Sequence, residues 1–250
     1  MKIIDKFLQI IKGRARNTGY CCELCGAELF DYPKTRACKN CIDRLYGESK
    51  PVCPKCGRQA VTSSVCLTCK SRVPAFHYGF SPFAYEGEIA SQINRLKNGN
   101  RRLAFFFGDE MAEYFLNRVA EEKRENLLIV PVPLTKEKRK SRGYNQAEDL
   151  AEHIYTVFVR ESIDCTFDSE VLEKKRETEN QKTLGFFDRE DNVAGVYHVH
   201  KRKVCKNKTI LLIDDIITTG ATASACAKLL LNAGADRVYA LCVASVPERR

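Results

Sequence analysis

Eight cysteines near the start of the chain constrain its fold more than any other feature, because they form four C-x-x-C pairs. The pairs are Cys22/Cys25, Cys38/Cys41, Cys53/Cys56 and Cys66/Cys69. The two thiolates of one pair can reach the same tetrahedral zinc ion, and a second pair completes a four-sulfur site. Gly26 and Gly57 directly follow the second cysteine of their pairs, as in the knuckles of zinc ribbons. We therefore predict structural zinc rather than redox-active thiols or a secreted disulfide framework.

The way in which the four pairs combine is left open by the sequence. They could hold two zinc ions in sequence, with pairs one and two together and pairs three and four together, or in a cross-braced arrangement. One site could also lack a metal, so the prediction is one or two Zn²⁺ ions. The segment is short and poor in apolar residues, so metal binding should supply its folding free energy. The remaining cysteines are expected to be a bystander, Cys21, and small core residues: Cys165, Cys205, Cys226 and Cys242.

The positive charge of the chain is concentrated at the same end. Residues 1–75 hold 14 Lys and Arg against 6 Asp and Glu, which accounts for +8 of the net charge of +9. Such a balance favours an anionic partner such as nucleic acid, although a solvated, solubilising surface explains it equally well. Zinc modules of this kind either bind nucleic acid or brace a neighbouring domain. Four aromatic side chains in this region could stack on bases or form the small core of the module: Tyr20, Phe30, Tyr32 and Tyr46.

The N-terminal stretch MKIIDKFLQIIKGR places its apolar residues largely on one side of a helix. Asp5 and Lys6 interrupt the apolar run, and no small-residue cleavage site follows, so it resembles a signal peptide only superficially. We expect an amphipathic helix that docks on the body of the protein, with contact to a membrane surface as the alternative. No apolar run approaches the roughly 20 residues that span a bilayer, so we expect a cytoplasmic protein without stable membrane insertion.

After Pro74 apolar strand-like runs alternate with helical patterns. Strands are expected within 76–87 and at 127–133, 166–172, 209–214 and 237–243, and helices at 88–99, 105–115, 144–159 and 221–233. Buried strands that alternate with helices predict an α/β fold with a parallel sheet covered on both faces. We therefore divide the chain into a zinc-binding module, residues 1–74, and an α/β domain, residues 75–250.

The stretch ILLIDDIITTGAT, residues 210–222, combines two kinds of ligand-binding group. Asp214 and Asp215 follow a predicted central strand, where open α/β sheets bind ligands. The turn that follows contains Thr218, Thr219 and Gly220 and leads into a helix, whose N-terminal N–H groups suit a phosphate. Paired carboxylates repel each other and suit hydroxyls or a metal instead. The combination predicts a site for a phosphoribose; a tight turn alone would explain the Thr and Gly residues but not the paired Asp. Neither a GxxxxGK nor a GxGxxG motif is present.

This stretch resembles the phosphoribosyl-pyrophosphate (PRPP) motif of type I phosphoribosyltransferases. The resemblance implies the phosphoribosyltransferase fold, and it implies that Asp214 and Asp215 hold the ribose hydroxyls. It also implies that the 5′-phosphate is bound by the residues of the following turn: Thr218, Thr219, Gly220, Ala221 and Thr222. PRPP would be accompanied by Mg²⁺.

The chain is similar to the ComF branch of competence proteins over nearly its whole length. The segments that carry the similarity are the cysteine-rich head, LKNG, PVPLTKEKRKSRGYNQA, RETENQKTLGFFDREDNVAG and the PRPP motif, in that order. The family's typical K-Y-x-G is represented by Lys97 and Gly99 without the aromatic residue. The similarity implies that Lys138, Arg139 and Arg142 lie on a basic pyrophosphate loop; a solvated basic loop is the alternative. Arg176, Thr178 and Gln181 match R-x-T-x-x-Q, the place of a mobile loop over the active site, and Arg176 would act there in catalysis.

Two functions remain open on this basis. One is a PRPP-binding factor in DNA uptake and natural transformation, with single-stranded DNA and other DNA-uptake proteins as partners. The other is an active phosphoribosyltransferase, in which an unidentified nitrogen nucleophile displaces pyrophosphate. A zinc-braced scaffold without a ligand would not explain the intact ribose and phosphate motifs. No histidine lies in a motif that would make it a general base.

Overall fold

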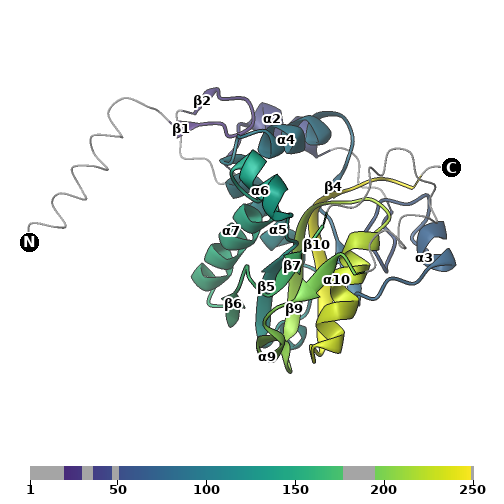
Figure 1. Cartoon of the computed structure of the whole chain (residues 1–250). Coiled ribbons are helices and arrows are strands. Elements are labelled where there is room, and N and C mark those ends of the chain that lie inside the picture. Colours follow the sequence, from purple (N-terminus) through teal and green to yellow (C-terminus); the bar gives the residue numbers. More distant parts are fainter. Residues whose placement is uncertain (1–19, 30–35, 47–50, 177–194, 249–250) are drawn as a thin grey trace, which may run out of the picture. The chain divides into compact units, whose positions relative to one another are not determined.

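The computed structural model describes residues 20–29, 36–46, 51–176 and 195–248, and the chain divides into two compact units, Met1–Gly47 and Glu48–Arg250 (Figure 1). The predicted N-terminal helix and the predicted roles of Phe30, Tyr32, Thr178 and Gln181 fall outside the described residues. A domain boundary between residues 74 and 75 stays a prediction.

The described residues of the first unit form a short antiparallel pair and a helix. Strands β1 (Tyr20–Cys21) and β2 (Glu28–Leu29) pair with each other, and α2 (Lys39–Leu45) follows. Its described buried apolar side chains are Cys22, Leu24, Ala37, Cys41 and Leu45, and two of them are cysteines of the predicted metal site.

A parallel sheet forms the centre of the second unit, as predicted. Its strands lie in the order β3 (Tyr78–Phe80), β10 (Arg237–Ser245), β9 (Thr209–Ile217), β5 (Leu127–Pro131) and β6 (Cys165–Phe167), and β4 (Phe83–Ala84) also pairs with β10. Every one of these pairings is parallel. All five residues of β5 are buried, because a parallel sheet has apolar cover on both faces.

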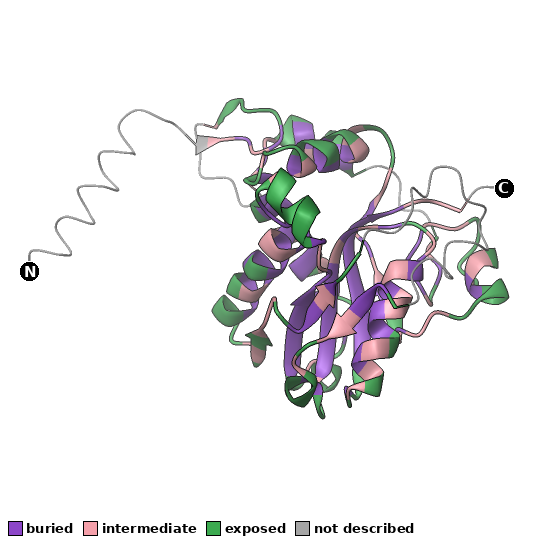
Figure 2. Cartoon of the chain, viewed as in Figure 1, coloured by how far each residue is buried: buried purple, intermediate pink, exposed green. Residues whose placement is uncertain are grey.

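Helices cover the two faces of this sheet (Figures 1 and 2). On one face α5 (Leu103–Leu116) and α7 (Gln146–Arg160) pack against each other and the sheet, and α4 (Gly87–Lys97) packs on α5. On the other face lies α10 (Ala221–Asn232), beside the antiparallel pair of β7 (Leu172–Lys174) and β8 (Tyr197–Val199). The shorter helices are α3 (Leu67–Ser71), α6 (Lys136–Arg142), α9 (Arg202–Cys205) and the 3-10 helix Glu121–Lys123. None of the helices in the described part of the chain has the length and apolar character needed to cross a membrane.

Several predicted elements differ from the structure for local reasons. The strand predicted at 166–172 is divided into β6 and β7 by a turn in which the Glu170 N–H donates to Asp168 Oδ1 at 2.8 Å. The strand predicted at 209–214 continues to Ile217, so Asp214 and Asp215 lie within β9 rather than after it. The predicted basic loop is the helix α6, because Thr135 caps its start through the Lys138 N–H and Gly143 ends it at φ +84°.

Candidate functional site

The eight paired cysteines form two separate clusters in the structure. The first cysteine cluster is Cys22, Cys25, Cys38 and Cys41, and the second is Cys53, Cys56, Cys66 and Cys69. Within each cluster all four sulfur atoms lie within 4.8 Å of one another. Pairs one and two therefore belong together, as do pairs three and four, and the cross-braced alternative is wrong.

Both clusters are built in the same way. The first pair of each lies on a turn that ends in a glycine at positive φ, Gly26 (+77°) or Gly57 (+71°). The second pair begins a helix, and the N–H of its first cysteine donates to the first sulfur of the cluster at 3.3 Å, from Cys38 to Cys22 and from Cys66 to Cys53. The glycines are required at the turns because only glycine adopts this conformation without strain.

The sulfur positions fit a tetrahedral zinc ion. Zn–S bonds of 2.3 Å in a tetrahedron require neighbouring sulfurs to lie about 3.8 Å apart. The Sγ atoms of Cys25 and Cys38 are 3.8 Å apart, and those of Cys56 and Cys66 are 3.7 Å apart. Each cluster could therefore hold one Zn²⁺ ion with all four of its cysteines. Three other cysteines, Cys205, Cys226 and Cys242, are buried in the core as predicted, whereas Cys21 and Cys165 are half-buried.

A second kind of site lies on β9, where Asp214 and Asp215 are adjacent. The Asp215 N–H donates to Asp214 Oδ1 at 2.8 Å. Burial raises the pKa of the Asp214 carboxyl well above its usual value, and the charge of Asp215 raises it further. Two carboxylates so close together are costly unless a cation or hydroxyl groups compensate them. The acidic pair, Asp214 and Asp215, therefore has the character of a ligand-binding site.

Asp215 has two partners that the sequence analysis did not place in the site. The Lys97 ammonium lies 2.7 Å from Asp215 Oδ2, and the Gln146 side-chain amide donates to the same oxygen at 3.4 Å. Lys97 ends α4 and Gln146 begins α7, so three elements meet at this carboxylate. The only signal in the sequence was that both residues fall in segments shared with the ComF family, LKNG and RGYNQA.

The turn after β9 presents backbone N–H groups, as the phosphoribose prediction requires. Thr218 is exposed and Thr219 is half-buried, and Thr219 Oγ1 accepts the Ala221 N–H at 3.3 Å. Gly220 precedes α10 with a φ of +82°, a conformation that turns the chain directly into the helix. Ala221 and Thr222 form the first turn of α10, where the N–H groups lack intrahelical partners and the helix dipole favours an anion.

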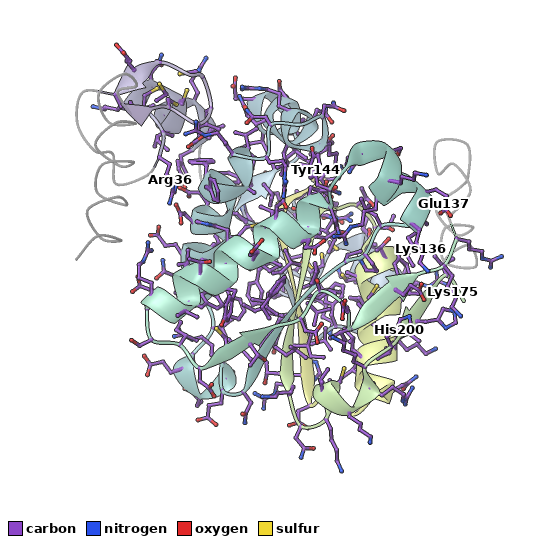
Figure 3. All side chains as sticks on the ribbon, turned by 60° about the vertical axis from the view of Figure 1, so that its left-hand side comes forward. Arg36, Lys136, Glu137, Tyr144, Lys175 and His200 are labelled. Atoms are coloured by element: carbon purple, nitrogen blue, oxygen red, sulfur yellow. The ribbon has the colours of Figure 1, made fainter. Side chains whose placement is uncertain are left out.

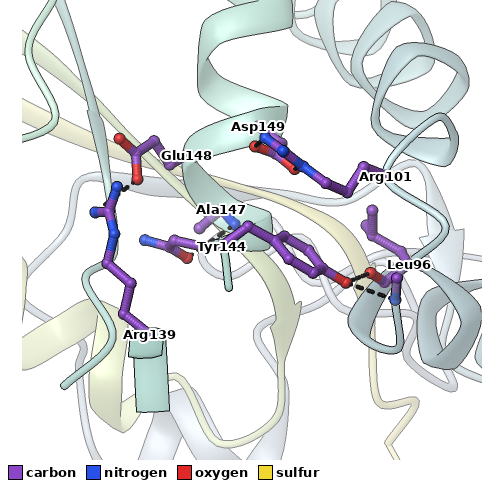
Figure 4. Close-up of polar contacts among 9 residues, drawn as sticks. Leu96, Arg101, Arg139, Tyr144, Ala147, Glu148 and Asp149 are labelled. Atoms are coloured by element: carbon purple, nitrogen blue, oxygen red, sulfur yellow. Dashed lines mark hydrogen bonds and ion pairs between the residues drawn. The ribbon is translucent and has the colours of Figure 1, made fainter. Parts of the chain in front are cut away.

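The three basic residues of the predicted pyrophosphate loop differ in how far they are engaged. Arg139 pairs with Glu148 at 2.8 Å (Figure 4), and the Arg142 guanidinium donates to Gln146. Lys138 is exposed, and no described residue forms an ion pair with its ammonium. Helix α6 follows β5, the neighbour of β9, so it begins at the carboxyl ends of the strands, where the acidic pair lies. Lys138 is thus the most available of the three cations for an anionic ligand.

The residues R-G-Y-N-Q, from the end of α6 to the start of α7, connect the elements at this end of the sheet. The Tyr144 hydroxyl donates to the Leu96 carbonyl and accepts the Gly99 N–H at 2.8 Å. Asn145 caps α7 through the Ala147 N–H and donates to the Val132 carbonyl at 3.1 Å. The motif is therefore a structural connection between α4, α7 and the end of β5, and not only a source of phosphate-binding charge.

Arg176 follows β7 by two residues and is exposed. It is the last described residue before the gap at 177–194. At the base of this segment Glu173 pairs with Lys136 of α6 at 3.3 Å and with His200 at 2.8 Å, where Figure 3 labels both partners. The hydrogen bonds from His200 and Lys136 lower the pKa of the Glu173 carboxyl. These contacts join α6 to the β7–β8 pair, whereas a catalytic role of Arg176 stays a prediction.

Comparison with known proteins agrees with this architecture. Residues 108–250 match the model of the phosphoribosyl transferase domain family. Competence protein ComFC of Bacillus subtilis is 29% identical over 209 residues, which is 81% of this chain and 80% of that protein. DNA utilization protein YhgH of Escherichia coli K12 is 26% identical over 82% of this chain and 88% of that protein, and competence protein F of Haemophilus influenzae is 26% identical with the same coverage.

The matched domain comprises α7, α10 and most of the parallel sheet, including β9 with its acidic pair and the turn into α10. The curated relatives are similar to this chain over most of its length, and their names agree with the family that its sequence resembles. The chain therefore belongs to the phosphoribosyl transferase domain family, in its ComF branch.

Proposed function

We propose that the protein binds PRPP together with Mg²⁺ at the carboxyl end of β9 and the N-terminus of α10. We also propose that it acts in DNA uptake as a ComF-type factor. The observation that supports this best is the order of groups along one strand, turn and helix: two adjacent carboxylates, a glycine at positive φ and a helix N-terminus whose N–H groups have no intrahelical partners. Carboxylates suit ribose hydroxyls, and helix N–H groups suit the 5′-phosphate.

The remaining groups would act on the pyrophosphate of PRPP. Mg²⁺, when bound, would neutralise charge on the pyrophosphate oxygens. Lys138 would pair with these oxygens from α6, and Arg176 would approach from the segment after β7. Asp214 and Asp215 would hold the ribose hydroxyls and thereby orient C1 of the sugar. Orientation of the reacting carbon is a large part of what a transferase site can contribute.

An enzymatic reaction is the second candidate function, and membership of a transferase family favours it. In that reaction the bond from C1 to pyrophosphate would break with the electron pair leaving on oxygen, while a bond from C1 to a nitrogen nucleophile forms. Release of PRPP pyrophosphate that depends on an added base or amine would support it.

The role in DNA uptake rests on the relatives, two of which are named as competence proteins and one as a DNA utilization protein. In this role the basic first unit would bind single-stranded DNA, with other DNA-uptake proteins as further partners. The zinc ions would be structural, one in each cysteine cluster, and a chain with so many reduced thiolates belongs in the reducing cytoplasm.

Calorimetric titration with PRPP and Mg²⁺ tests the proposed site. The wild type should bind, and an Asp214→Asn/Asp215→Asn double variant should not, because each substitution removes the negative charge and replaces one acceptor oxygen by a donor amide. Asp236→Asn is a matched control, since Asp236 is an exposed carboxylate outside the site. Equal binding by the wild type and the double variant would show that the ribose site is elsewhere, and absence of binding to the wild type would overturn the proposal.

Anisotropy of a labelled single-stranded oligonucleotide tests the DNA-binding role separately. Lys39→Glu changes an exposed lysine of the first unit, and Lys70→Glu, for comparison, changes an exposed lysine next to the second cysteine cluster. We expect Lys39→Glu to weaken binding and to reduce its salt dependence, because each phosphate contact releases counterions. Unchanged binding and salt dependence in Lys39→Glu would argue against contact through this residue.

A further inference from the structure

The acidic pair is already partly compensated by a cation of the protein itself. Lys97 is about one-quarter exposed, and Asp215, its partner at 2.7 Å, is only 7% exposed. The positive charge of Lys97 also opposes the rise in the pKa of Asp214 that burial and Asp215 cause. A buried carboxylate rarely lacks a compensating partner, and here a lysine from a distant helix supplies it.

The position of Lys97 is fixed by contacts on both sides of it in the chain. The Tyr144 hydroxyl contacts the Leu96 carbonyl and the Gly99 N–H, so it clamps the end of α4 (Figure 4). Tyr144 is itself held, because the Arg101 guanidinium lies over its ring at 5.2 Å and forms two hydrogen bonds with Asp149, at 2.8 and 2.6 Å. This network aims Lys97 at Asp215 instead of leaving it as a flexible surface lysine.

A lysine at the end of a helix often serves only to compensate the helix dipole. Lys97 does more than this, because its ammonium makes a direct contact with a carboxylate of another element. The contact between the Lys97 ammonium and Asp215 Oδ2 therefore assigns Lys97 to the acidic pair.

We infer that Lys97 is a positioning residue that acts as the built-in counter-ion of Asp215 and keeps free divalent cations off the acidic pair. A site compensated in this way attracts a metal ion alone less strongly, because a second cation would be repelled by the ammonium. A metal then enters only together with an anionic polyphosphate, whose negative charge restores the balance. The choice of PRPP as that polyphosphate rests on the proposed function; the exclusion of free cations does not.

Binding of Mn²⁺ in the absence of PRPP, followed by electron paramagnetic resonance, tests this inference. Lys97→Met removes the charge and keeps a chain of similar length. It should raise Mn²⁺ affinity by roughly five- to thirtyfold over the wild type, because one nearby positive charge is lost at a partly exposed site. Lys97→Arg keeps the charge and should behave as the wild type. Lys97→Met/Asp215→Asn should lose the gain, which assigns the bound Mn²⁺ to the acidic pair.

The outcomes against the inference are equally definite. Equal Mn²⁺ affinity in the wild type and Lys97→Met, including no binding to either, would overturn it. A rise of the same size in Lys97→Arg would show that shape rather than charge is responsible, and would overturn it too. Melting curves of each variant identify any loss of fold, and Lys97→Gln serves as a second uncharged variant if Lys97→Met does not fold.

The Tyr144 clamp provides an independent measurement. Tyr144→Phe removes the hydroxyl that holds Leu96 and Gly99 but leaves every charge in place, so we expect a smaller rise in Mn²⁺ affinity than for Lys97→Met. An affinity equal to the wild type would show that the clamp does not position Lys97. PRPP titrations of the same variants separate the two proposals: if Mn²⁺ binding changes as expected while the wild type fails to bind PRPP, the ligand is wrong and the role of Lys97 stands.

Discussion

The two cysteine clusters have the same ligands and the same local geometry, but their surroundings differ. In the first cluster Cys25 is exposed and Cys38 half-buried, whereas all four cysteines of the second are buried. A Cβ atom added to Gly26 would meet no described atom within 4 Å, whereas one added to Gly57 would lie 2.3 Å from the Gly79 carbonyl oxygen of β3. The first turn is therefore open, and the second is pressed against the sheet.

Several hydrogen bonds also tie the second cluster to the rest of its unit. The Gly79 N–H donates to the Lys55 carbonyl at 2.9 Å, and the Lys55 ammonium donates to the Phe76 and His77 carbonyls at 2.6 and 2.9 Å. The second cluster is thus part of the core of the transferase-type domain, whereas the first supports a small unit of its own. Two clusters of four cysteines can therefore be surrounded by folded units of very different size.

Loss of a ligand in the second cluster should have the largest effect. We expect Cys56→Ser to abolish cooperative folding of the unit Glu48–Arg250, because structural zinc contributes about 10 kcal/mol or more to folding. Differential scanning calorimetry and zinc analysis of the purified variant would measure this.

The matched change in the first cluster is Cys25→Ser. It should lower the zinc content by one equivalent and leave the main thermal transition in place. If both variants lost the main transition, or neither did, the proposed difference between the clusters would be wrong.

The two turn glycines allow a comparison at nearly equal φ. Gly26→Ala should cost about 1–2 kcal/mol, the strain of an L-residue in the left-handed region. Gly57→Ala should cost roughly 1–3 kcal/mol more than Gly26→Ala, since its Cβ would also overlap the backbone of β3. Chemical denaturation of each variant, followed by the zinc-dependent signal of the affected cluster, gives the two values, and equal costs would contradict the close approach.

Zinc release should be biphasic. A chromogenic chelator should remove the metal of the first cluster at least tenfold faster than that of the second, because opening a buried cluster requires a larger local unfolding. Stopped-flow absorbance with the Cys25→Ser variant as reference assigns the phases, and a single phase for both ions would show that burial does not control release.

The smallest expected effect is at the C-terminal contact of the second cluster. Glu248 Oε1 accepts the Leu67 N–H at 2.7 Å at the start of α3. Glu248→Gln keeps the acceptor and removes the charge, so we expect a loss of less than about 1 kcal/mol in the free energy of unfolding. Urea denaturation measures it, with Glu125→Gln as a control at an exposed carboxylate, and a loss of several kcal/mol would indicate a larger role for this contact.

Local patterns made much of the fold predictable. The apolar run of β9, the acidic pair and the Thr/Gly turn are neighbours in the sequence, so their arrangement follows from strand and helix geometry alone. The C-x-x-C spacing likewise predicted the eight cysteines that form the two clusters. Even the helical form of α6 was available in the sequence, because Thr135 and Gly143 are typical cap residues at its two ends.

Contacts between distant segments could not be predicted in the same way. The pairing of the clusters depends on how the chain folds between the cysteine pairs. The contact of Lys97 with Asp215 spans 118 residues of sequence and depends on the packing of α4 and α7 around Tyr144. Nothing in the spacing of the second cluster shows that it packs against β3, because Gly79 looks like an ordinary strand glycine until its neighbour is known.

The close approach of Gly57 and Gly79 has a consequence for solubility. Strand β3 is an edge strand, and an uncovered edge offers free N–H and C=O groups to the strands of other molecules, which leads to aggregation. Here the Cys56–Gly57 turn covers that edge, and the Lys55 carbonyl accepts its Gly79 N–H. In a zinc-depleted cell the protein would therefore expose the aggregation-prone edge of β3 as well as lose the fold around the second cluster. The metal-free protein would tend to accumulate in insoluble form.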